Sequence, residues 1–117
     1  MENELDKLRI MLREANIPFE DIQQKFAPEL IQHYDTEYNR LRFGDNWIWD
    51  RNQIVYAPDG YRLMDGICQY GSYGSKEGLI ETYYELGWDE HGNPQVMTAE
   101  EAFAIIKEDW EERRGKK

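Results

Sequence analysis

The amino-acid sequence predicts an α+β fold: a three- to four-stranded antiparallel sheet packed against N- and C-terminal helices, with a further helix inserted before the sheet. Two observations lead to this class. Apolar residues recur at helical spacing near both ends of the chain, whereas residues 47–97 alternate in the manner of strands. Helical and strand-like segments therefore form separate runs, which is typical of α+β proteins. The length of 117 residues matches one domain, predicted to span residues 1–117.

The first predicted helix covers Glu2–Ala15. Its apolar side chains fall on one face, at Leu5, Leu8, Leu12 and Ala15. Oppositely charged residues three positions apart are expected to form ion pairs on its surface: Glu4 with Lys7, and Asp6 with Arg9. Asn16 and Pro18 follow where a helix would end.

A second helix is predicted over Pro28–Arg42. Proline suits the first turn of a helix, because the N–H that it lacks would have no partner there. The apolar residues that follow at helical spacing are Leu30, Ile31, Tyr34, Tyr38 and Leu41. Gly44 is expected to end this helix. The preceding stretch, Glu20–Lys25, either joins it or forms a separate short helix.

The last predicted helix begins after Thr98. Thr98 and Glu101 have the spacing of a capping box, in which the threonine oxygen accepts from a helical amide and the glutamate reaches back. The apolar stripe of this helix is formed by Ala99, Phe103, Ile106 and Trp110. Gly115 is expected to end it.

Strand-like segments fill the region between the second and last helices. They are Trp47–Tyr56, Tyr61–Tyr70, Leu79–Trp88 and the short segment Gln95–Met97. Pro58–Gly60 predicts a turn, because proline presets φ and glycine adopts the left-handed conformation. Asp89–Pro94 is a second polar turn. Consecutive strands joined by turns predict antiparallel pairing.

Charge restricts the partners of this protein. The chain has 24 acidic residues against 14 lysines and arginines, a formal net charge of −10. Binding to phosphates of nucleic acids or to anionic membranes requires clustered cations, so no direct nucleic acid and no membrane are expected as partners. A negative surface favours a partner protein with a basic surface, or else serves only solubility. The acidic N-terminus and the lack of a long apolar run favour a cytoplasmic location.

No constellation of catalytic or metal-binding residues emerges from the spacing. His33 and His91 lie far apart in the predicted layout, and Cys68 is the single cysteine. Cys68 falls in a strand-like segment, which predicts a buried and unreactive thiol. The sequence therefore predicts a protein that is not an enzyme and has no cofactor and no metal.

A glycine-rich segment between two predicted strands is the first candidate site. Its candidate ligand-binding residues are Tyr70, Gly71, Ser72, Tyr73, Gly74, Ser75, Lys76 and Gly78. The order of the glycines does not fit a P-loop or a dinucleotide-binding fingerprint. Backbone amides here could still form a nest for an anion, assisted by Lys76 and the serine hydroxyls. The alternative is an irregular connection that needs glycine for its shape.

The second candidate site is a protein-binding face on the sheet. Aromatic residues make up 14% of the chain, which exceeds the need of one small core. Tyrosine and tryptophan are enriched at binding hot spots. The residues predicted for this face are Asp65, Glu81, Tyr83 and Glu85. The alternative is a tyrosine-rich sheet face covered by a helix.

Several segments, taken in order, carry a resemblance. They are Arg51–Tyr56, Ile67–Cys68, Gly71–Gly74, Glu77–Glu81 and Met97–Phe103. In this order they resemble small uncharacterised proteins encoded by phages and prophages of Gram-positive bacteria. The resemblance covers Arg51 onward and the first helix, whereas Asp21–Trp47 matches less well and reads as an insertion.

The resemblance implies a phage accessory protein in the cytoplasm of a bacterial host. It would act by non-catalytic binding, as an antagonist of a host defence or nucleic-acid-handling protein. The alternative is a protein that binds or sequesters a small ligand, such as a nucleotide signal, through the glycine-rich loop. An enzyme is the least favoured of the three.

Overall fold

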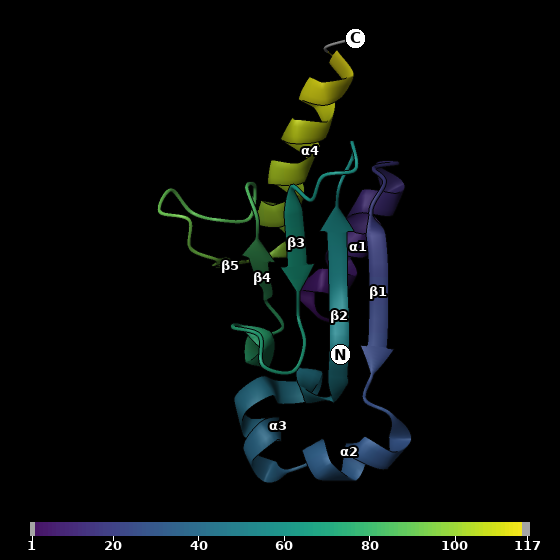
Figure 1. The fold of residues 1–117 in the computed structure, drawn as a ribbon, viewed down its shortest axis with the longest axis vertical. Helices are drawn as coiled ribbons and strands as arrows, with labels where there is room; N and C mark the ends of the chain where they lie inside the picture. Colours follow the sequence, from purple (N-terminus) through teal and green to yellow (C-terminus); the bar gives the residue numbers. More distant parts are fainter. Residues whose placement is uncertain (1, 116–117) are drawn as a thin grey trace.

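A computed structural model describes residues 2–115 and shows a five-stranded antiparallel sheet with four α-helices (Figure 1). The strands are β1 (Glu20–Lys25), β2 (Trp49–Tyr56), β3 (Met64–Ile67), β4 (Ile80–Tyr83) and β5 (Gln95–Met97). The helices are α1 (Glu4–Glu14), α2 (Pro28–Tyr34), α3 (Glu37–Phe43) and α4 (Ala99–Gly115), with short 3₁₀ turns η1 (Gly44–Ile48) and η2 (Ser75–Glu77). The strands follow in chain order across the sheet. The α+β class is confirmed, with more strands than predicted.

The additional strand is β1, where the sequence predicted helix. Its residues pair with β2 from Glu20 opposite Val55 to Lys25 opposite Trp49. Ile22 is its one apolar residue, so neither alternation nor a helical stripe was visible in the sequence. A polar edge strand of this kind resists pairing with other chains.

The predicted helix over Pro28–Arg42 is two helices. Asp35 and Thr36 interrupt it, and the Thr36 hydroxyl accepts from the Asn39 amide at 3.1 Å, which starts α3 anew. Threonine is more favourable at the N-cap of a helix than in the helix interior. Helices α2 and α3 lie across one end of the sheet and cover neither of its faces (Figure 1).

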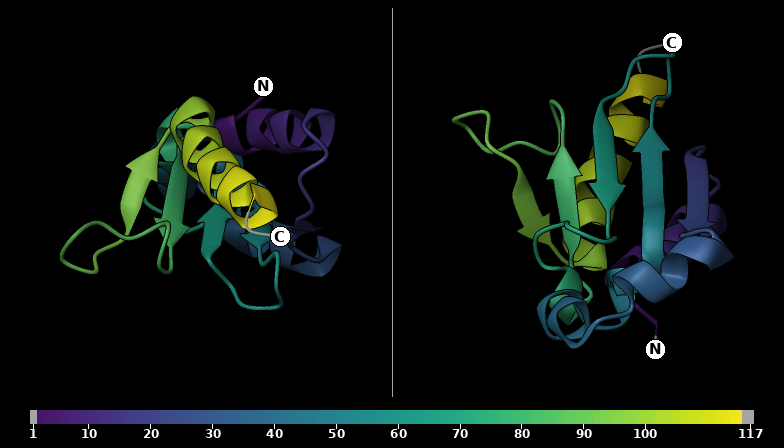
Figure 2. Two further views of the ribbon diagram at one scale, coloured as in Figure 1. Left: turned by 90° about the horizontal axis from the view of Figure 1, so that it is seen from above. Right: turned by 60° about the horizontal axis from the view of Figure 1, so that its bottom comes forward.

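The core lies between the sheet and the two terminal helices. Figure 2 shows α1 and α4 together on one side of the strands. The predicted stripe of α1 is confirmed for Leu5, Leu8 and Leu12, which are fully buried, whereas Ala15 is exposed and forms the C-cap. The capping box of α4 is confirmed as well: the Glu101 amide donates to the Thr98 hydroxyl at 3.3 Å, and the Thr98 amide donates to the Glu101 carboxylate at 3.0 Å.

None of the helices within residues 2–115 lies over the other face of the sheet (Figure 2). Its strands are shorter than predicted: β3 covers four residues of the expected Tyr61–Tyr70, and β4 ends at Tyr83. The chain turns at Tyr84, whose φ of +75° no strand accommodates. Within residues 2–115, no helix combines the length and the apolar character that a membrane span requires.

Candidate functional site

The glycine-rich loop between β3 and β4 lines an open cavity of about 490 Å³. Seven of the eight residues predicted to bind a ligand, Tyr70 through Lys76, line this cavity. Gly78 does not; its carbonyl instead accepts from the Glu4 amide at 2.8 Å, joining the loop to α1. Arg42 and Phe43 of α3 also line the cavity, and sequence reasoning missed both. The volume lies within the usual range of small-molecule sites.

The serines give the loop its shape. The Ser72 hydroxyl donates to the Gln69 carbonyl at 2.8 Å, and the Ser75 hydroxyl donates to the Ser72 carbonyl at 2.8 Å. Both serines are buried. Their hydroxyls are therefore engaged within the loop, and the structure assigns them a structural role where the sequence suggested ligand contact.

Most amides of the loop are also engaged. The Tyr73 amide donates to the Glu81 carboxylate at 3.0 Å, and the amides of Ser72 and Gly78 donate to loop carbonyls at 3.0 Å. An extended nest of free amides, as the sequence suggested, is thus not formed. Binding of an anion at this cavity would fall mainly on the side chains of Arg42 and Lys76.

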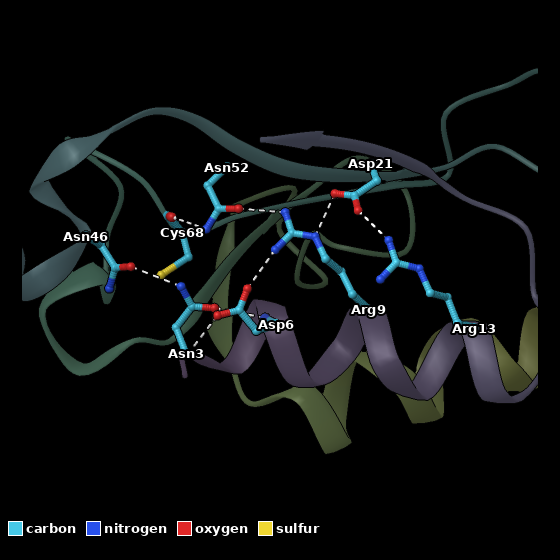
Figure 3. A network of polar contacts seen from close by, with 8 residues as sticks. All are labelled: Asn3, Asp6, Arg9, Arg13, Asp21, Asn46, Asn52 and Cys68. Atoms are coloured by element: carbon cyan, nitrogen blue, oxygen red, sulfur yellow. Dashed lines mark hydrogen bonds and ion pairs between the residues drawn. The ribbon is translucent and has the colours of Figure 1, made fainter. Parts of the chain in front are cut away.

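Three chain segments fix the cavity walls against one another. Gly44, at the end of α3, adopts a φ of +58°, and a Cβ there would lie 2.8 Å from the Lys76 carbonyl oxygen. The Asn46 amide group donates to the Ser75 carbonyl at 2.7 Å. Asn3 in turn donates to Asn46 at 3.0 Å (Figure 3). The cavity is therefore preformed by contacts among α3, the loop and the start of α1.

The aromatic residues of the cavity differ in freedom. Tyr70 packs edge-on against Phe26, Tyr34 and Phe43, with ring centroids 5.6, 5.2 and 4.8 Å away. This cluster ties α2 and α3 to the sheet. Tyr73 is 73% exposed, so its ring remains free to contact a ligand.

The cations of the cavity lack carboxylate partners. Elsewhere in residues 2–115 most lysines and arginines form ion pairs, including Lys7, Arg13, Arg40, Arg62 and Arg113. Arg42 lies near the rings of Tyr38 and Phe43 and donates to the Tyr38 hydroxyl. Among the described residues, neither Arg42 nor Lys76 forms an ion pair. Glu77 also lines the cavity. Two unpaired cations at one cavity stand out in a chain of net charge −10.

The residues predicted for a protein-binding face are mostly engaged inside the protein. Asp65 and Glu81 are 5% and 3% exposed. Asp65 accepts from Gln53 at 2.6 Å and from Arg62 at 3.1 Å, while Glu81 accepts from Tyr73. Tyr83 is half-buried, and burial together with its hydrogen bond to Glu81 raises its pKa to about 12. Only Glu85, in the turn after β4, is exposed.

Replacing Asp65 by asparagine is expected to raise the free energy of unfolding at pH 7 by up to about 1 kcal/mol. Burial raises the pKa of Asp65, and its Oδ1 atom has no hydrogen-bond partner. The native state thus holds this proton more tightly than the unfolded chain, so ionisation costs stability as the pH rises through the native pKa. The gain from Asp65→Asn should shrink as the pH falls to about 4. Urea unfolding at both pH values measures it; an equal gain at both would contradict the assignment.

The single cysteine and the two histidines, the remaining candidates for chemistry, lie in different parts of the fold. Cys68 is buried, as predicted, and burial raises its pKa to about 12. His33 contacts Tyr34, whereas His91 lies near Glu90 in the turn after β4. In the part of the chain that the structure describes, no group of three His, Cys, Asp or Glu residues is placed to hold a metal ion.

Comparison with protein-family models, with curated proteins and with solved structures found no match to this chain.

Proposed function

We propose that this protein is a non-catalytic binder of a small anionic ligand with a planar group, of the nucleotide class, at the cavity between α3 and the glycine-rich loop. The observation that supports this proposal is that two cations without carboxylate partners, Arg42 of α3 and Lys76 of the loop, line the same preformed cavity. In a chain of net charge −10, two cations without ion pairs at one cavity provide local attraction for an anion.

The two cations would contact the anionic group in different ways. The guanidinium of Arg42 presents planar paired donors, which suit a phosphate. Lys76 would act as a flexible point charge on the loop side. Because Gly44 and Asn46 hold the walls together, little ordering would be needed on binding.

The planar group would contact the exposed Tyr73 ring at the rim of the cavity. Stacking of a base on an aromatic side chain is tolerant of base identity. Tyr70, although it lines the cavity, is held in its cluster and would contribute a wall. A protein that holds a nucleotide without transforming it would sequester that ligand, which fits the phage accessory role implied by the resemblance.

A panel of nucleotides, including cyclic dinucleotides and nucleoside diphosphates, is expected to contain a ligand that raises the melting temperature. At a ligand concentration of 100 times Kd, the rise should be on the order of 10 °C. The double variant Arg42→Gln/Lys76→Gln should lose most of this rise, because both charge contacts are removed.

Arg114→Gln is the matched control, because Arg114 is an exposed cation at the far end of α4. It should keep the full thermal shift. A panel without any stabilising nucleotide, or an equal loss in Arg114→Gln, would rule out the proposed site.

A further inference from the structure

The turn after β4 lies at the opposite end of this strand from the glycine-rich loop (Figure 1). This turn carries two stacked aromatic rings. The rings of Tyr84 and Trp88 have centroids 5.7 Å apart and an interplanar angle of 24°. They are 36% and 40% exposed. Exposed pairs of large aromatic rings are typical of binding hot spots.

The backbone at Tyr84 is strained. Its φ of +75° is uncommon for any residue with a Cβ and is a clear outlier for a bulky one. The conformation is held because the amides of Gly87 and Trp88 both donate to the Tyr84 carbonyl at 2.8 Å. Glycine or asparagine would adopt this φ more readily. Such strain concentrates at functional sites, which makes Tyr84 a candidate functional residue.

The turn that carries the stack contributes acidic residues and no lysine or arginine. Residues 84–93 contain Glu85, Asp89 and Glu90 but no lysine or arginine. Asp89 accepts from the amides of His91 and Asn93, at 2.8 and 3.0 Å, and so shapes the turn. Glu85 and Glu90 are exposed. Exposed aromatic rings in a turn with exposed carboxylates are complementary to lysine and arginine side chains.

One cation of the protein already contacts this stack. The Arg62 guanidinium lies 6.0 Å from the centroid of the Tyr84 ring, while its other contact is the Asp65 carboxylate. The stack thus accepts a guanidinium from within the chain. Trp88, the larger ring, has no cation over it among the described residues.

We propose that Tyr84 and Trp88, with Glu85 and Glu90, form a docking surface for a lysine- and arginine-rich segment of a partner protein. Basic side chains would lie on the aromatic rings and pair with the two exposed carboxylates. The net charge of −10 would speed the approach of such a partner. This surface lies at the other end of β4 from the ligand cavity, so each proposal can fail without the other.

A fluorescent peptide of alternating arginine and serine serves as the probe, titrated at about 0.15 M salt and read by anisotropy. Trp88→Ala and Tyr84→Gly should each weaken binding by at least about fivefold, because a cation–π contact is lost. Glycine at position 84 readily adopts the positive φ that this turn requires, so the Tyr84→Gly variant should keep the fold. Tyr38→Ala, which removes an exposed tyrosine of α3, should bind as the wild type does.

A second pair of variants separates this surface from general attraction to an acidic protein. Glu85→Gln/Glu90→Gln and Glu108→Gln/Glu112→Gln remove the same charge, the latter from the exposed side of α4. Only the first should weaken binding at least about fivefold. Equal weakening by the two double variants, or unchanged binding by Trp88→Ala and Tyr84→Gly, would overturn the proposal.

Discussion

Replacing Arg9 by methionine is expected to lower the free energy of unfolding by about 3–5 kcal/mol. The Arg9 side chain is only 4% exposed and joins α1 to the sheet (Figure 3). It donates to Asp21 at 2.6 Å, to Asn52 at 2.6 Å and to Asp6 at 3.0 Å. Removing the cation leaves two carboxylates near one another and a buried amide oxygen without its donor. Urea unfolding followed by circular dichroism measures the loss.

Arg13→Met is the matched control, because Arg13 binds the same carboxylate. Its distance to Asp21 is 2.7 Å, close to that of Arg9, but its side chain is 59% exposed. An exposed ion pair contributes about 0–1 kcal/mol, so this variant should be nearly as stable as the wild type. Similar losses in both variants would show that burial does not set the strength of these pairs.

The Arg9 network also shows how far local sequence patterns reach. The pair of Asp6 with Arg9 was predicted from helical spacing and is confirmed at 3.0 Å. Asp21 and Asn52 could not be predicted as partners, because they come from strands that only the folded sheet places beside α1. The same applies to β1 itself. Its strand conformation depends on pairing with β2, because its polar residues show no periodicity of their own.

The sequence predicted the loop residues of the candidate cavity but not the residues that α3 contributes. Glycines 71 and 74 marked the loop because their positive φ values require glycine-like freedom. Arg42 and Phe43 had no local signal, since their place beside the loop depends on the end of α3. Gly44 was interpreted only as a helix end. Its second role, close approach of two backbones, depends on a tertiary contact that no sequence spacing reveals.

Replacing Gly44 by alanine is expected to lower the free energy of unfolding by about 2–4 kcal/mol. Two costs combine. The φ of +58° disfavours any residue with a Cβ, and the new Cβ would lie 2.8 Å from the Lys76 carbonyl oxygen. That atom belongs to backbone, so one wall of the cavity must move. Urea unfolding gives the loss, and a nucleotide that stabilises the wild type should stabilise this variant far less.

Gly71→Ala separates these two costs. Gly71 has a φ of +84°, but a Cβ there would meet nothing within 4 Å. This variant should therefore lose only about 1 kcal/mol, from backbone strain alone, and should keep the cavity walls in place. If Gly44→Ala were no less stable than Gly71→Ala, the close contact between α3 and the loop would not hold the walls together. The preformed cavity on which the ligand proposal depends would then lose its physical basis.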